Sequence, residues 1–272
     1  MKRRNFLGIA SSTLAVSFLD AHSLLAFSGC ASGNKTSAGQ PLIKKLRLQT
    51  ACPLTEMKKF YWETIGFAIV HETLLELTIQ AGTTLITFEY IKLDGDRPFY
   101  HFAFNIPENK IQKAFEWQRK KTAIIHPNPK GPTDKITHFA HWDAHSIFFL
   151  DPAGNLLEYI ARHTLNNAAQ GDFSVNDILY ASEIGFIVDN VSASGTELMQ
   201  GLNISEYKPL SDEFWPVGDE NGLLLLIKKG KEWHANENQK NITDVFETKV
   251  TISPDTQDKF IFTGYPYEIS IG

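Results

Sequence analysis

The sequence predicts an α+β fold in which a module of one strand, one helix and three further strands repeats along the chain. Two stretches of apolar patterns, over 42–91 and 99–162, show this order of elements. A third stretch, which starts near residue 181, repeats parts of the second, as expected for one supersecondary unit used several times. The 272 residues suit one large domain or two small ones.

The composition argues against two broad classes of protein. Hydrophobic residues make up 43% of the chain and charged residues 21%, which is typical of a folded domain rather than a disordered chain. The formal net charge is −5, and no basic stripe with interleaved aromatic residues occurs. We therefore expect no nucleic acid among the partners of this protein.

The first 30 residues have the pattern of a bacterial export signal. An apolar run over 6–19 follows a basic start and is too short to span a membrane comfortably. Residues 3–7, RRNFL, resemble the twin-arginine export motif, so we expect the folded protein to reach the periplasm. Residues 27–30, FSGC, resemble a lipoprotein box, which implies lipidation of Cys30 and a membrane anchor. The alternative is cleavage near the same site without a lipid, and in either case residues 31–42 form a flexible tether.

The first module begins with a strand over 42–51, where apolar and polar residues alternate. Apolar residues at helical spacing then predict a helix over 54–66, with Thr55 as its cap and Gly66 as its end. Three short strands complete the module, at 67–72, 74–80 and 84–91.

The second module has the same order of elements. A strand over 99–106 precedes an amphipathic helix over 108–121. A loop rich in proline and glycine occupies 126–135, and two strands, 145–151 and 155–162, follow it.

An internal repeat defines the third module. His101–Ile106 matches Glu183–Val188, and Asp151–Glu158 matches Asp219–Leu226. His101 precedes Asp151 by 50 residues, whereas Glu183 precedes Asp219 by only 36, so the third module is reduced. The chain after it, from Val245, reads as further strands at an edge.

Three stretches resemble the vicinal oxygen chelate superfamily, which includes glyoxalases, extradiol dioxygenases and bleomycin- and fosfomycin-resistance proteins. They are FYWETIGF (60–67), YHFAFNIP (100–107) and FFLDPAGNLLEYIAR (148–162). The resemblance implies paired βαβββ modules whose curved mixed sheets enclose a cleft. It also implies that active members hold a divalent metal there on two or three His and Glu side chains. We expect a paired domain over 43–163 and a reduced C-terminal module over 175–272.

His101 and Glu158 occupy the positions at which this superfamily places metal ligands. Because side chains alternate along a strand, each shares its face with apolar neighbours, which indicates a cleft rather than bulk water. His101 would bind Fe, Mn, Ni or Zn as neutral imidazole, and Glu158 would be the anionic ligand or a catalytic base. The alternatives are a hydrogen-bonded interior histidine and an edge-strand charge that deters aggregation.

A third ligand is missing from the expected pattern. The first strand, over 44–49, contains no His, Asp or Glu, and its Gln49 would coordinate only weakly. Glu183 matches His101 in the repeat, but the position that matches Glu158 holds Leu226. Two ligands hold a metal poorly, so a third must come from elsewhere in the chain.

Further histidines lie at positions 138, 141 and 145, around Trp142. We expect this segment to be a loop at the mouth of the cleft, where Trp142 and His145 contact a ligand. A solvated loop without a ligand is the alternative. The second cysteine, Cys52, is expected to be a packing residue.

These observations lead to three hypotheses of function. The first is an exported metal-dependent lyase, isomerase or ring-cleaving dioxygenase that acts on a small oxygenated substrate. The second is a non-catalytic module that sequesters a small molecule. The third is a scaffold that pairs with another chain, including a second copy, through its C-terminal module.

Overall fold

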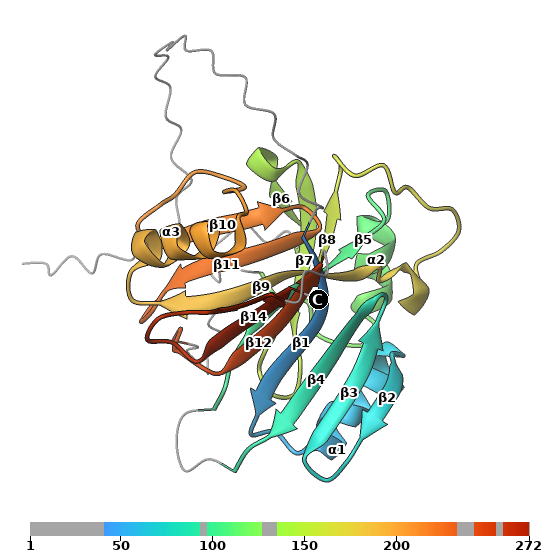
Figure 1. The fold of residues 1–272 in the computed structure, drawn as a ribbon. Coiled ribbons are helices and arrows are strands. Elements are labelled where there is room, and N and C mark those ends of the chain that lie inside the picture. The colour runs from blue at the N-terminus through green and yellow to red at the C-terminus, as the bar shows by residue number, and fades with distance from the viewer. Residues whose placement is uncertain (1–40, 93–96, 127–134, 233–241, 254–257, 272) are drawn as a thin grey trace, which may run out of the picture. The chain divides into compact units, whose positions relative to one another are not determined.

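The computed structural model describes residues 41–92, 97–126, 135–232, 242–253 and 258–271. The predicted export signal, Cys30 and nearly all of the tether lie outside these residues, as does most of the Pro-rich loop. The described residues form 14 strands, which make up two seven-stranded mixed sheets (Figure 1). No helix among them is long and apolar enough to cross a membrane.

The first sheet combines the first module with the C-terminal strands. In spatial order its strands are β13 (Asp258–Ile261), β14 (Tyr267–Ile271), β12 (Thr248–Ser253), β1 (Leu42–Thr50), β4 (Thr84–Tyr90), β3 (Glu76–Ala81) and β2 (Ala68–Glu72). β1 runs parallel to β4 and antiparallel to β12, so β1 joins the two groups of strands.

The second sheet combines the second and third modules. In spatial order its strands are β10 (Phe214–Asp219), β11 (Gly222–Lys228), β9 (Tyr180–Val188), β5 (His101–Ile106), β8 (Leu156–Arg162), β7 (Ala144–Leu150) and β6 (Thr137–Phe139). The first strands of the two modules, β5 and β9, pair antiparallel at the centre of the sheet. The third module is reduced, because only two strands of this sheet, β10 and β11, follow its helix.

The predicted fold class is therefore confirmed: it is α+β, with βαβββ modules, mixed sheets and a reduced third module. Each sheet contains strands from both sides of the expected boundary between 163 and 175. The division into two domains at that boundary stays a prediction.

The first helix is α1 (Leu54–Lys58), which continues as a π-helical turn, η1 (Lys59–Ile65). Gly66 ends it, as predicted, in the left-handed conformation with φ 103°. The predicted cap is wrong, because Thr55 lies inside the first turn and Pro53 takes the N-cap position. Proline fits there, since its φ is fixed and the first helical N–H groups need no partner within the helix.

The other two helices cover one face of the second sheet. α2 (Ile111–Gln118) is shorter than the predicted helix over 108–121. α3 (Val191–Leu202) begins at Asn190, whose side chain accepts a hydrogen bond from the Ala193 N–H. In Figure 1, α3 lies against β10 and β11.

The main core lies between these helices, the second sheet and the first sheet. Phe102 and Phe104 of β5, like Leu224 and Leu226 of β11, point into it. The residues between them in sequence therefore point to the opposite face of the second sheet, which the helices leave uncovered. We call this opposite face the site face.

Candidate metal site

Three buried acidic and imidazole side chains converge on the site face. They are His101 of β5, Glu158 of β8 and Glu183 of β9, and each is at most 4% exposed. One ligand atom from each lies within 4.8 Å of the others. His101 Nε2 is 3.5 Å from Glu158 Oε2 and 3.8 Å from Glu183 Oε2. The described residues contain no other group of three or more potential ligands this close together.

Strand pairing explains why these residues meet. β5 lies between β8 and β9, and Ala103 is in register with both Glu158 and Glu183. The two carboxylates therefore flank the small side chain of Ala103, while His101 projects from the same face two residues earlier. An alanine at this position leaves space between the carboxylates.

A β-bulge sets the register of Glu183. Ala103 pairs with Glu183 but Phe104 pairs with Ala181, so Ser182 is an extra residue in β9. Such a bulge changes which face a side chain meets without ending the ladder. Here it lets Glu183 share the site face while Ala181 turns into the core.

The turn between β7 and β8 anchors the strand that carries Glu158. Asp151 accepts hydrogen bonds from the backbone N–H and the side-chain amide of Asn155, at 2.9 and 2.8 Å. Tyr61 donates a third hydrogen bond to Asp151 at 2.7 Å, and Asn155 accepts one from the Tyr100 N–H at 2.9 Å. The buried polar groups of this turn are therefore satisfied, and they tie β8 both to the start of β5 and to η1.

A backbone contact orients His101. Its Nδ1 lies 3.0 Å from the carbonyl oxygen of Leu156. A carbonyl can only accept, so Nδ1 carries a proton. Nε2 faces the two carboxylates, with a proton when the ring is charged and with a lone pair for a metal when the ring is neutral. This is the usual arrangement of a histidine that binds a metal through Nε2.

A positive charge between His101, Glu158 and Glu183 would stabilise this group, because its two buried carboxylates repel each other. Burial, and next the charge of Glu183, raise the pKa of Glu158 to about 7. Burial lowers the pKa of His101, but the hydrogen bond to Glu183 and the charges of both carboxylates outweigh it, so that pKa is raised overall. Either a proton or a metal ion would relieve the repulsion between the carboxylates.

Arg162, at the end of β8, holds one oxygen of Glu183. Its Nη2 pairs with Glu183 Oε1, and its Nε donates a hydrogen bond to Asn105 Oδ1 at 3.2 Å. Trp142 lies over the guanidinium, 5.6 Å from its carbon to the ring centre. Because Arg162 occupies Oε1, Glu183 presents its other oxygen, Oε2, to His101. Arg162 Nη1 is buried and has no hydrogen-bond partner in the described part of the chain.

One part of the site face is apolar. Ile187, Leu223, Leu225 and Ile227 form one buried cluster there, against which Trp142, Tyr207 and Phe214 pack. Trp142 meets Tyr207 edge-on, with ring centres 5.3 Å apart. This wall keeps water from the polar group and so strengthens its electrostatic interactions.

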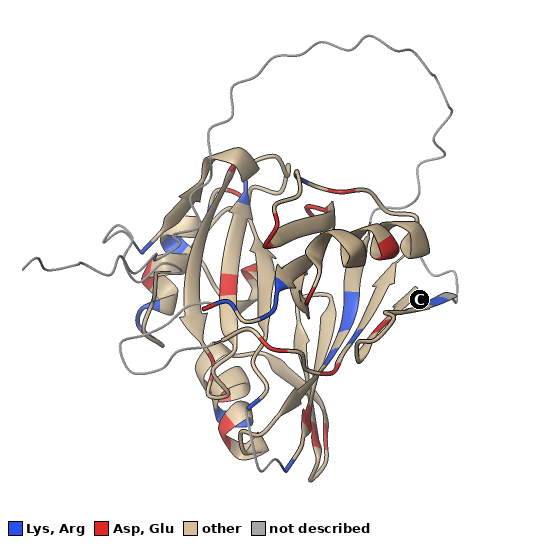
Figure 2. Cartoon of the chain, turned by 90° about the vertical axis from the view of Figure 1, so that its left-hand side faces the viewer, with Lys and Arg blue, Asp and Glu red and all other residues tan. Residues whose placement is uncertain are grey.

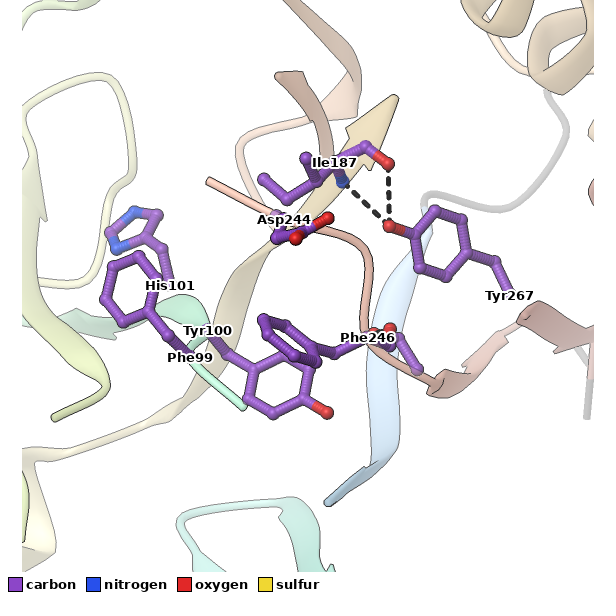
Figure 3. Close-up of a pocket in the computed structure, with 9 residues that line it drawn as sticks. Phe99, Tyr100, His101, Ile187, Asp244, Phe246 and Tyr267 are labelled. Carbon is purple, nitrogen blue, oxygen red and sulfur yellow. Dashed lines mark hydrogen bonds between the residues drawn. The ribbon is translucent and has the colours of Figure 1, made fainter. Parts of the chain in front are cut away.

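A small pocket opens beside His101 (Figure 3). Its lining comes from both sheets and from the segment before β12: Phe99, Tyr100, His101, Gly185, Ile187, Asp244, Phe246, Thr248 and Tyr267. The Tyr267 hydroxyl donates to the Ile187 carbonyl at 2.7 Å, which joins the two sheets at this point. In Figure 3, His101 and Asp244 lie on different sides of the pocket.

The first sheet carries charged and polar side chains that interact with one another. Arg47 forms ion pairs with Glu76 and Glu89 there, and Gln49 donates a hydrogen bond to Glu247 at 3.1 Å. Acidic and basic positions are interspersed over the chain in the view of Figure 2. The side chain of Gln49, the weak ligand considered from the sequence, is thus engaged with Glu247.

The structure thus brings His101 and Glu158 together and adds Glu183, which sequence reasoning had set aside. Glu183 was assigned to a separate, incomplete site in the third module, whereas β9 places it beside β5. The sequence match with His101 was the available signal. The repeat match to Leu226 is also wrong by one residue, because the strand register equates Glu158 with Leu225, while Leu226 points into the core.

The two expected ligand contacts lie on opposite faces of the second sheet. Trp142 ends a short 3-10 helix, η2 (Ala140–Trp142), and packs over the site face. His145 follows in β7, next to Ala144, which contacts the site-face cluster, so the histidine side chain points to the other face. The structure does not bring His145 to the His101 group.

The similarity of this chain to known proteins is one of fold and not of sequence. The sequence matches no protein-family model and none of the curated proteins. A proposed dioxygenase from Bacillus subtilis is 14% identical, with a TM-score of 0.52 over 82% of this chain and 73% of that chain. A point mutant of glyoxalase I from Zea mays is 14% identical, with a TM-score of 0.50 over 85% of this chain and 92% of that chain. The chain has the fold of the vicinal oxygen chelate proteins.

Proposed function

We propose that the protein binds one divalent metal ion through His101, Glu158 and Glu183 and acts with it on a small oxygenated substrate. The observation that carries this proposal is the convergence of three buried ligand atoms within 4.8 Å. The activity classes that it favours are those of the fold, a lyase, an isomerase or a ring-cleaving dioxygenase.

The donor set fits a metal of the first transition row. One imidazole and two carboxylates suit Fe²⁺, Mn²⁺, Ni²⁺ or Zn²⁺. Ligand atoms about 2.1 Å from a tetrahedral ion lie about 3.4 Å apart. The separations of 3.5 and 3.8 Å from His101 Nε2 to the two carboxylates are close to this value.

The residues around the proposed metal site have different roles. A bound metal would supply Lewis acidity towards neighbouring oxygens of the substrate. Leu156 holds His101 in the binding tautomer, and Arg162 holds Glu183 by its other oxygen. Glu158 is an anionic ligand when the metal is bound, and in the metal-free protein its pKa of about 7 suits it to accept a proton as a base. The buried Nη1 of Arg162 offers a donor to an anionic oxygen of a ligand.

Mn²⁺ is the best probe of the site, because oxygen-rich ligand sets suit it and nitrogen-rich ones do not. The chelator-treated full chain should bind one equivalent in equilibrium dialysis, and Glu183→Gln and His101→Ala should bind none. His71→Ala is the control, since that side chain is 56% exposed and lies on β2. Wild-type protein that binds no Mn²⁺, Fe²⁺, Ni²⁺ or Zn²⁺ would contradict the proposal.

The burial of the ligands favours a second candidate, a non-catalytic module that sequesters a small molecule. His101, Glu158 and Glu183 are at most 4% exposed, and the pocket beside them is small. Turnover of catechols or α-hydroxycarbonyl compounds that depends on added metal and is lost in Glu158→Gln supports the enzyme. Ligand binding without turnover by the metal-loaded protein supports sequestration.

We also propose that the protein is exported and anchored through Cys30. The support is the twin-arginine-like segment and the lipoprotein-like FSGC sequence. In a bacterial host, membrane fractions should contain the protein labelled with radioactive palmitate, and Cys30→Ala should remove the label. Unlabelled wild-type protein in the soluble periplasmic fraction would leave cleavage without a lipid as the explanation.

A further inference from the structure

Three histidines and one glutamate gather on the face of the second sheet opposite the candidate metal site. His138 of β6 is in register with His145 of β7. His163 follows β8 directly, and its N–H donates to the Asp143 carbonyl at 2.8 Å. Glu108 precedes α2, which packs against β7 and β8. None of the four takes part in the His101 group.

These four side chains contact one another in sequence. His145 Nδ1 and His163 Nε2 are 2.8 Å apart, and the two rings meet at 68°. His138 stacks on His145 with ring centres 4.4 Å apart. His163 Nδ1 lies 3.2 Å from Glu108 Oε2. Because a carboxylate accepts, His163 carries its proton on Nδ1 and presents the lone pair of Nε2 to His145.

The group is accessible from solvent. It lines a groove of about 600 Å³, whose other walls are Asn109, Ile111, Gln112 and Ile136. The side chains of His163 and Glu108 are each 28% exposed. An ion with its water molecules can therefore reach the two facing nitrogens.

We propose that His145 and His163 form a second metal site, which takes Cu²⁺ or Ni²⁺. Two nitrogens each about 2.0 Å from an ion lie about 2.8 Å apart at a right angle and about 3.3 Å apart at a tetrahedral angle. The observed 2.8 Å matches the right angle that Cu²⁺ and Ni²⁺ prefer over the tetrahedral geometry of Zn²⁺.

The surroundings of the two ligands support this choice. Glu108 holds the far nitrogen of His163, as carboxylates do behind metal-binding histidines. Burial, and next the neighbouring His138 and His163, lower the pKa of His145, so its ring is neutral at neutral pH. In the metal-free protein His145 Nδ1 donates its proton to the hydrogen bond with His163 Nε2; when the ion binds, this proton moves to Nε2 of the same ring, and no net proton is released. His138 is the nearest further imidazole, and groove water completes the coordination.

Cu²⁺ alone is the probe for this site. The full chain, first loaded with one equivalent of Zn²⁺, which gives no paramagnetic signal and binds more tightly than Mn²⁺, is titrated with Cu²⁺ and followed by electron paramagnetic resonance. We expect one bound Cu²⁺ whose spectrum shows coupling to at least two imidazole nitrogens. His163→Gln and His145→Gln should each weaken binding at least 100-fold, and Glu108→Gln should weaken it about 10- to 100-fold.

Two variants separate this site from the first. His101→Ala should leave the Cu²⁺ spectrum unchanged, and His71→Ala is the matched exposed control. The inference is overturned if His163→Gln, shown to be folded by circular dichroism, keeps the wild-type spectrum. It is also overturned if the signal is lost in His101→Ala, because Cu²⁺ then binds at the first site. Failure of Mn²⁺ binding with retained Cu²⁺ binding would contradict only the proposed function.

Discussion

Glu158→Gln should stabilise the metal-free protein at alkaline pH, although it removes a metal ligand. Burial and the charge of Glu183 raise the pKa of Glu158 from 4.5 to about 7 in the folded protein. The folded state therefore binds more protons than the unfolded state between these values, so stability falls as the pH rises through this window. A shift of this size corresponds to about 3 kcal/mol above pH 7.

The assay is urea unfolding of chelator-treated protein at pH 5 and pH 8. Wild type should lose about 3 kcal/mol more between these pH values than Glu158→Gln, which has no carboxyl to ionise at this position. Glu63→Gln, at an exposed position in η1, should lose as much stability as wild type. Parallel loss in wild type and Glu158→Gln would refute the view that two buried carboxylates repel each other here.

Three further predictions concern the same region. Glu183→Gln should destabilise the metal-free protein by about 2–4 kcal/mol in urea unfolding, because Arg162 is fully buried and loses its charged partner; an unchanged midpoint would contradict this pairing. Ala103→Leu should fill the space between the carboxylates and abolish Mn²⁺ binding in equilibrium dialysis, at a cost of about 1–3 kcal/mol in stability. Retained Mn²⁺ affinity would show that the ion sits elsewhere. Tyr61→Phe should cost about 1–3 kcal/mol by thermal unfolding, because it removes a donor from the buried Asp151.

Local patterns were sufficient to predict the modules. The strand of His101 and the turn before Glu158 could be located because alternation and turn residues act within a few positions. The end of the first helix at Gly66 followed from the need for a left-handed residue there. The predicted helix over 108–121 was too long at both ends, since Lys110 has a non-helical backbone and residues 119–121 form a turn.

The pairing of strands could not be predicted in the same way. The residues of β5 define a strand and its two faces, but they do not specify that β9 lies beside it. That choice depends on contacts between distant parts of the chain. Glu183 was therefore visible as the repeat of His101, while its place in the same group was not. Arg162 was missed for another reason, since charged residues are rarely buried and nothing local indicates its partner.

An anomalous difference map from a crystal of the Mn²⁺-loaded protein tests the central claim most directly. We expect one strong peak about 2.1–2.3 Å from His101 Nε2 and from one carboxylate oxygen each of Glu158 and Glu183. A fully occupied peak at another place, with these three side chains unchanged, would contradict the claim that they form the metal site.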